Sequence, residues 1–172
     1  MSTYPLIEAL TKEKRMSVGR FCAMIGALIW HTQTGKYLLL RRIAARGGNW
    51  ECVTGRLEQG ESYTVALQRE VREEVGVAVQ IDFLIGTTHF YRGEKVIENE
   101  MIGVQFCCSL DNPETIRLSE EHDAYQWVTA AEAETLLAEG RWLKNIIRRA
   151  EVIRKSLPAE LLAYYRSNGF EA

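Results

Sequence analysis

The chain has 172 residues, of which 47% are hydrophobic and 26% are charged, and its formal net charge is −2. This length allows one domain with a buried core, and the composition is that of an ordinary globular protein. A net charge so close to zero excludes a general attraction for polyanions, so a nucleic-acid partner is not expected and a phosphorylated ligand must be held locally.

The N-terminal segment 1–16 is predicted to be an extension in front of the domain. Residues Tyr4–Lys14 can form a short helix with Leu6, Ile7 and Leu10 on one side. Such a helix would pack on the body of the protein or on a second subunit, so a homodimer is a candidate assembly. The segment lacks a signal-peptide pattern, and no apolar run reaches the ~20 residues that span a bilayer. We therefore expect a cytoplasmic protein without a membrane partner.

Two apolar segments then predict a β-hairpin. Val18–Trp30 is a long strand candidate, and the turn TQTGK separates it from a second candidate at Tyr37–Arg42. A connection with two glycines leads to a short predicted strand at Asn49–Thr54. Arginines in this region carry guanidinium groups that suit phosphate oxygens, although each could equally be an ordinary surface residue. They are Arg41, Arg42 and Arg46.

The sequence from Ser62 to Val75 predicts a helix of about four turns. It contains no Pro or Gly, Ser62 is a suitable N-cap, and Gly76 is a suitable C-terminal stop. At roughly 100° per residue, one side of this helix is an apolar stripe that would face the core. The stripe consists of Leu67, Val71 and Val75.

An acidic stripe, Glu70, Glu73 and Glu74, lies directly beside the apolar one, where the wall of a cleft would be. Acids in the last turns oppose the helix dipole at about 0.3–1 kcal/mol each, and like charges one turn apart also repel one another. Arg69 and Arg72 can relieve part of this repulsion. A hard divalent cation would relieve more, since magnesium binds a few carboxylates together with substrate phosphates. The alternative is a solvated acidic helix face, which such a run of charges usually is.

The stretch Gly55–Val77 fits the pattern G-x5-E-x7-R-E-U-x-E-E-x-G-U, with U an apolar residue, at every fixed position. Because this pattern is the Nudix box, the chain resembles a Nudix hydrolase. The resemblance implies an α/β fold, the α/β/α sandwich with a central mixed β-sheet. It also implies metal-dependent attack of water on the diphosphate linkage of a nucleoside diphosphate derivative. The implied cofactor is Mg²⁺, with Mn²⁺ as an alternative.

The roles of the family's residues transfer by position in the box. Glu61 would pair with Arg69 and fix the loop onto the helix, and Gly55 would offer its carbonyl to a metal. The metals would polarise the bridging phosphates and make water more acidic. Three acids would be the metal ligands, and one of them could also act as the base: Glu70, Glu73 and Glu74.

The residues that open the box indicate a narrower class of substrates. Many Nudix boxes open with Pro-Gly-Gly, whereas this chain has Val53-Thr54-Gly55-Arg56. This opening resembles that of the bacterial dihydroneopterin triphosphate and dATP pyrophosphohydrolases. The resemblance points to nucleotide-like triphosphates.

Two further apolar segments, Val77–Phe90 and Met101–Ser109, predict a second hairpin around a polar loop. Phe90 and Tyr91 could stack on a base or a pterin ring, although aromatic residues at a strand end more often pack. His89 is interpreted as structural.

The segment Ile116–Val128 carries a second resemblance. Its E-H-x-A-Y-x-W stretch is similar to one in dATP-pyrophosphohydrolase-like and diadenosine tetraphosphate hydrolase relatives, in which a loop glutamate approaches the metals from outside the helix. The resemblance therefore implies Glu121 as an extra metal ligand or base. Glu121 could instead be a solvated loop acid. The alternatives for its role are Glu120, Glu98 and Glu100.

The C-terminal part, residues 130–172, predicts helices at Ala130–Glu139, Trp142–Lys155 and Pro158–Ser167 that cover one face of the sheet. Their basic residues are those of an exposed helix face, and nothing indicates a second domain. The four cysteines have no CxxC or zinc spacing, so we interpret them as reduced core residues.

The sequence thus predicts a single Nudix hydrolase domain over residues 1–172, which cleaves a nucleoside triphosphate or a related substrate to a monophosphate product. The predicted substrate-binding residues are Arg41, Arg46, Phe90 and Tyr91. Rival substrates are diadenosine tetraphosphate, nucleotide sugars and the 5′ end of RNA, because the box binds metals and not the base. A rival of another class is a nucleotide-binding Nudix module without turnover, although the intact acids of the box argue against it.

Overall fold

A computed structural model of the chain describes residues 21–112 and 116–171. The predicted N-terminal extension and its helix lie outside the described residues. The strands are β1 (Cys22–His31), β2 (Tyr37–Arg42), β3 (Trp50–Glu51), β4 (Val53–Arg56), β5 (Gln80–Tyr91), β6 (Glu100–Leu110) and β7 (His122–Val128). The helices are α2 (Tyr63–Val75), α3 (Ala130–Leu136), α4 (Trp142–Ser156) and α5 (Ala159–Asn168), with short 3-10 turns η1 (Ala44–Arg46) and η2 (Ile97–Asn99).

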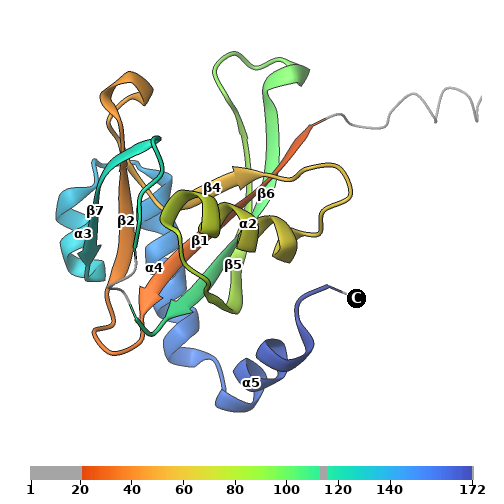
Figure 1. Cartoon of the computed structure of the whole chain (residues 1–172), viewed down its shortest axis with the longest axis vertical. Helices are drawn as coiled ribbons and strands as arrows, with labels where there is room; N and C mark the ends of the chain where they lie inside the picture. The colour runs from red at the N-terminus through yellow and green to blue at the C-terminus, as the bar shows by residue number, and fades with distance from the viewer. Residues whose placement is uncertain (1–20, 113–115, 172) are drawn as a thin grey trace, which may run out of the picture.

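A seven-stranded mixed sheet forms the centre of the molecule (Figure 1). Its main path runs β3-β2-β1-β6-β5, while β4 pairs with β1 and β7 pairs with β2. Strand β1 is antiparallel to β2 and β4 but parallel to β6, from Cys22 opposite Met101 to His31 opposite Leu110. Strands β5 and β6 form an antiparallel hairpin. Both predicted hairpins and the mixed sheet are therefore confirmed.

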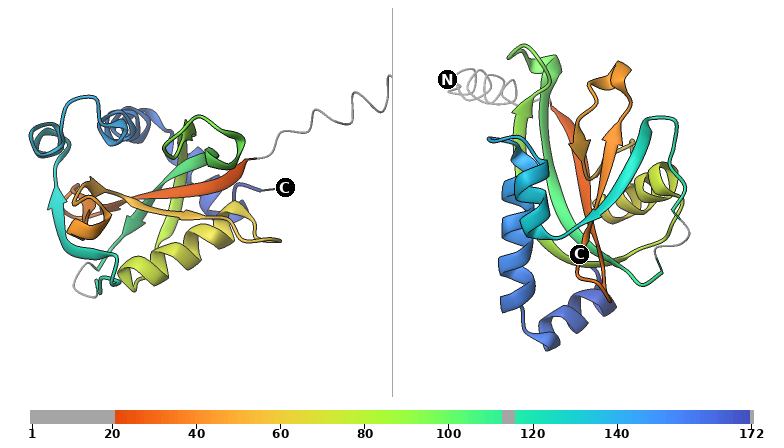
Figure 2. Two further views of the ribbon diagram at one scale, coloured as in Figure 1. Left: turned by 90° about the horizontal axis from the view of Figure 1, so that it is seen from above. Right: turned by 90° about the vertical axis from the view of Figure 1, so that its left-hand side faces the viewer.

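Helices cover both faces of this sheet. Figure 2 shows α2 on one face and α3 with α4 on the opposite face. The predicted apolar stripe of α2 is fully buried against the first face. On the second face, Leu143 and Ile147 of α4 pack with Leu28 and Leu39 of the sheet. The arrangement confirms the predicted α/β/α sandwich.

The last helix differs from the prediction that all C-terminal helices cover one face. Helix α5 lies along β5, the edge strand of the main path, and Arg166 donates to the buried Asp82 at 2.6 and 2.8 Å. Beyond α5, Glu171 accepts the Tyr63 N–H at 2.5 Å and the Thr64 hydroxyl at 2.8 Å. Helix α5 thus covers the exposed edge of β5, and an uncovered strand edge could otherwise pair with another chain. The end of the chain thus reaches around the sheet to the first turn of α2.

The predicted strand Asn49–Thr54 is in fact two strands. Strand β3 pairs with β2, with Glu51 opposite Leu40, whereas β4 pairs with β1. The chain changes partner at Cys52, whose side chain is fully buried. Consequently Gly55, which we expected just after a strand, lies inside β4 opposite Ile25.

Three of the four cysteines are buried, as expected for reduced core residues. Cys52, Cys107 and Cys108 are buried, whereas Cys22 is half-buried, and all four are free thiols. Among the helices of the described ranges, none is long and apolar enough to cross a bilayer.

Candidate active site

The carboxylates of the box project from α2, whose two ends are fixed by local structure as predicted. The Ser62 hydroxyl oxygen accepts the Val65 N–H at 3.3 Å. Gly76 ends the helix in the left-handed conformation, with φ 71°, which an L side chain rarely adopts. With both ends fixed and the apolar stripe buried, the next face of the helix turns Glu70 and Glu74 toward a cavity.

Arg69 ties the loop before α2 to the helix. Its Nε and Nη2 donate to the two carboxylate oxygens of Glu61 at 2.8 and 2.9 Å, and Nη2 also donates to the Arg56 carbonyl at 2.9 Å. Its Nη1 donates to Glu70 at 2.8 Å and to Glu73 at 3.3 Å. The Arg69 hydrogen bonds lower the pKa of Glu61 to about 2. The pairing expected between Glu61 and Arg69 is thus present.

The Glu70 side chain lies so close to Gly55 that a residue with a Cβ at position 55 would clash with it. A Cβ at position 55 would lie 1.8 Å from the carboxyl carbon of Glu70 and 2.0 Å from its Oε1. The Glu70 side chain therefore rests against the bare backbone of β4. Burial raises the pKa of Glu70, although the neighbouring guanidinium of Arg69 opposes the shift.

Glu74 is the most deeply placed acid of the box, since only 6% of the residue is exposed. Its Oε2 has no hydrogen-bond partner among the residues that the structure describes. Burial, together with the negative charges of Glu51 and Glu70, raises the pKa of Glu74 to about 9. Glu73, by contrast, has a side chain that is 59% exposed. A buried carboxylate with an unpaired oxygen is costly, and a bound cation would offset that cost.

The three box acids line a cavity of about 310 Å³ together with residues from strand ends and loops. Glu121 and Arg46 line the same cavity, and they form an ion pair at 2.5 Å. The structure therefore brings two further predicted site residues to the box. The remaining charged residues of the lining are Arg42, Arg56 and Arg92.

Sequence reasoning missed a buried polar group behind Glu74. Glu51 accepts a hydrogen bond from His122 Nε2 at 3.0 Å and forms an ion pair with Arg42. The same Nε2 lies 4.0 Å from Glu74 Oε2. Burial would raise the pKa of Glu51, but the hydrogen bonds from His122 and Arg42 lower it. The one feature of the sequence that places His122 near the site is that it directly follows Glu121, a predicted site residue.

Other predicted residues lie outside the lining of this cavity. Arg41 donates to Asp123 at 2.6 Å, and the Tyr91 ring faces His89 and Lys95. The substrate-binding roles of Arg41, Phe90 and Tyr91 stay predictions. Residues proposed as alternatives to Glu121 also lie outside the lining: Glu98, Glu100 and Glu120.

The donor chemistry of the cavity fits a divalent cation. Within residues 21–112 and 116–171, no three His, Cys, Asp or Glu side chains are already grouped as metal ligands. Instead, Arg69 engages both Glu70 and Glu73. An all-oxygen set of carboxylates is what Mg²⁺ and Mn²⁺ prefer, and the unpaired Oε2 of Glu74 adds an acceptor. Arg69 therefore offsets part of the negative charge of Glu70 and Glu73 in the metal-free protein.

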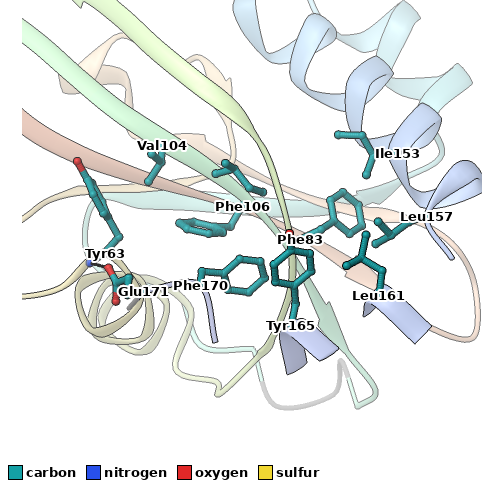
Figure 3. Close-up of a pocket in the computed structure, with 11 residues that line it drawn as sticks. Tyr63, Phe83, Val104, Phe106, Ile153, Leu157, Leu161, Tyr165, Phe170 and Glu171 are labelled. Atoms are coloured by element: carbon teal, nitrogen blue, oxygen red, sulfur yellow. Dashed lines mark hydrogen bonds between the residues drawn. The ribbon is translucent and has the colours of Figure 1, made fainter. Parts of the chain in front are cut away.

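A larger cavity of about 470 Å³ lies at the β5 edge and shares no lining residue with the first. Figure 3 shows mostly aromatic and aliphatic side chains around it. Phe170 stacks on Tyr165 with ring centroids 4.8 Å apart and meets Phe106 edge-on at 5.3 Å. Glu171, the acid of this lining, is already engaged by the start of α2. The smaller, charged cavity is therefore the candidate active site.

Several known proteins are similar to this chain in sequence or in structure. A nucleoside triphosphatase, NudI of Escherichia coli O17:K52:H18, is 34% identical over 105 residues, which are 55% of this chain and 73% of that protein. An octanoyltransferase of Myxococcus xanthus is 37% identical over 116 residues, which are 67% of this chain. The chain spans only 32% of the length of that relative. Among solved structures, the E. coli dihydroneopterin triphosphate pyrophosphohydrolase superposes with a TM-score of 0.60 at 26% identity, covering 78% of this chain and 99% of that one.

The family model of the NUDIX domain matches residues 22–150, a range that contains the box and the whole lining of the charged cavity. This match and the nucleoside triphosphatase relative confirm the predicted class of enzyme, a hydrolase acting on phosphoric anhydride bonds. Since the match covers more than half of its length, the chain belongs to the NUDIX domain family.

Proposed function

We propose that the protein is a Mg²⁺-dependent pyrophosphohydrolase that cleaves a nucleoside triphosphate, or a related nucleoside diphosphate derivative, to a monophosphate product. The observation that carries this proposal is that one cavity combines the carboxylates of α2 with four arginines. Carboxylate oxygens suit a hard divalent cation, and guanidinium groups suit phosphate oxygens. Both parts of a metal–polyphosphate complex therefore have partners in the same place.

The metal ligands would be Glu70, Glu73 and Glu74, with the Gly55 carbonyl and Glu121 as further oxygen donors. When bound, the cation polarises phosphate oxygens and makes a water molecule more acidic. The protein holds these donors in place: the core fixes α2, and the contact with Gly55 fixes Glu70. Mn²⁺, which has the same preference for oxygen, is the expected substitute.

The polyphosphate would lie against the arginines of the cavity. Arg42 and Arg46 are paired with Glu51 and Glu121. Arg56 and Arg92 form no side-chain ion pair with any residue of the described ranges, so they are the arginines most available to phosphate oxygens. Replacing either by Ala should raise KM while leaving kcat nearly unchanged, if they contribute uniform binding.

The support for a triphosphate substrate comes from the opening of the box and from the names of similar proteins. The Val53-Thr54-Gly55 opening of the box resembles that of triphosphate pyrophosphohydrolases, and two of the similar proteins are named for triphosphate substrates. Neither feature identifies the base. The predicted stacking of Phe90 and Tyr91 on a ring belongs to the same proposal.

A substrate screen tests this proposal. Nucleoside triphosphates, dihydroneopterin triphosphate, diadenosine tetraphosphate and nucleotide sugars are incubated with the enzyme and Mg²⁺, and products are identified by ³¹P NMR. A triphosphate pyrophosphohydrolase releases pyrophosphate and a monophosphate. Release of orthophosphate, or turnover of only the dinucleotide or the sugar nucleotide, would reject the proposed substrate class. Binding of nucleotides without any turnover would favour the non-catalytic module.

A further inference from the structure

His122 and Glu51 form a buried pair on the inner side of the candidate metal site. His122 is the first residue of β7, and its side chain is fully buried. Its Nε2 lies 3.0 Å from Glu51 Oε1 and 4.0 Å from Glu74 Oε2. Arg42 pairs with the same oxygen of Glu51. One ring nitrogen of His122 therefore lies near both Glu51 and the deepest acid of the box.

The hydrogen on this ring can be placed from the chemistry of the partners. A carboxylate only accepts hydrogen bonds, so Nε2 must carry the hydrogen that bonds Glu51. Glu51 is itself paired with Arg42, so the carboxylate that binds the ring is anchored to β2. Glu74 Oε2 lies 4.0 Å from the same Nε2, beyond hydrogen-bond distance in the metal-free protein, and has no hydrogen-bond partner within the described residues.

This arrangement is costly if it serves only to fill the core. Two buried polar atoms, His122 Nδ1 and Glu74 Oε2, lack partners among the residues that the structure describes. Unpaired buried polar atoms are few in folded proteins, and each calls for an explanation. An aliphatic side chain at position 122 would avoid one of them. A role toward the carboxylate beside it gives the pair such an explanation.

We propose that His122, held by Glu51, is a positioning residue for Glu74: it fixes the inner side of that carboxylate so that the acid is presented to the cation in the cavity. The inference rests on the proposed function, because it assigns Glu74 to the metal site. Outer partners of metal-binding carboxylates act in this way, and their loss typically weakens metal affinity by about 10–100-fold.

The test measures Mn²⁺ binding in the absence of substrate, with free Mn²⁺ followed by electron paramagnetic resonance. His122→Leu removes the N–H donor at similar volume, whereas His122→Gln keeps a donor. We expect the Leu variant to lose about 10–100-fold in Mn²⁺ affinity and the Gln variant to lose much less. The control is His89→Leu, because His89 also pairs with a glutamate, at 2.8 Å from Glu100, but is 57% exposed and outside the cavity lining.

Thermal unfolding shows whether each variant is folded. If the Leu variant does not fold, Glu51→Gln replaces it, since this change weakens the hold on the ring, and about a tenfold loss is expected. Unchanged Mn²⁺ affinity in the folded variant, or an equal loss with Leu and Gln at position 122, would overturn the inference. If the wild-type protein itself binds no Mn²⁺, the proposed function fails as well, so the two failures are distinguishable.

Discussion

Replacing Glu74 by Gln should make the metal-free protein more stable while making the enzyme much slower. Burial raises the pKa of the Glu74 carboxyl from 4.5 to about 9. At pH 7 this group must take up a proton on folding, which costs up to about 3 kcal/mol at ~1.4 kcal/mol per pH unit. The amide of Gln is neutral but also buried, so we expect a net gain in unfolding free energy of about 1–2 kcal/mol. For a chain of this size, that gain corresponds to an increase in Tm of roughly 2–8 °C.

The gain in stability from Glu74→Gln should increase with pH. Because the pKa of Glu74 is higher in the folded state, the unfolded state loses this proton first, and wild-type stability falls as pH rises from 4.5 toward 9. Gln has no proton to lose. The difference in Tm between the two proteins, measured in a chelator, should therefore be small near pH 5 and widen toward pH 9.

Activity should change in the opposite direction. Removing one electrostatic catalytic group typically lowers kcat by about 100-fold or more. Saturating Mg²⁺ should raise the Tm of the wild type more than that of the variant, since the ligand binds only the folded site. The matched control is Glu73→Gln on the exposed side of the same helix, which should lose activity without gaining stability. A Glu74→Gln variant that is less stable in chelator, or that turns over at a near-normal rate, would refute this reasoning.

Two of the three further predictions concern residues that hold the site, and the third concerns the contact between Tyr37 of β2 and Glu151 of α4. Gly55→Ala should lower kcat on the order of 100-fold, because the new Cβ would lie 1.8 Å from the Glu70 carboxyl carbon and displace it; steady-state rates and Mn²⁺ binding would show this. Arg69→Lys should lower kcat at least ~10-fold, since an ammonium group cannot replace the fork of hydrogen bonds to the acids around it, and normal rates would contradict the assigned role. Burial alone would raise the pKa of Glu151, yet hydrogen bonds, that of Tyr37 foremost, lower it to about 2. The stability this acid contributes is thus present above pH 4.5 and lost as pH falls toward 2, so the Tm difference between wild type and Glu151→Gln should vanish over that range.

The local features of the box could be predicted because each depends on neighbours in the sequence. The helix begins at the Ser62 cap and ends at Gly76 as the pattern indicated. The buried stripe of α2 follows from the helical period alone. The pairing of Glu61 with Arg69 came from the resemblance, and the structure shows it at 2.8 and 2.9 Å.

The inner wall of the site could not be predicted in this way, because it is assembled by strand pairing. Glu51 on β3 and His122 on β7 meet only because both strands pair with β2. Arg41 and Arg42 are consecutive residues of β2, and the pairing of β2 with β7 shifts register between them, so the alternation of a regular strand does not say which of the two side chains reaches the cavity. The cavity is lined by Arg42. Arg92 likewise reaches the cavity from the far end of β5, which no local pattern indicates.

The hydrogen bond from the Tyr63 backbone to Glu171 joins positions 108 apart in the chain. A purification tag, a protease cut or a truncation placed just beyond Asn168 would therefore disturb the first turn of the helix that bears the box acids. Preparations that differ only in this final segment should not be treated as equivalent when their rates are compared.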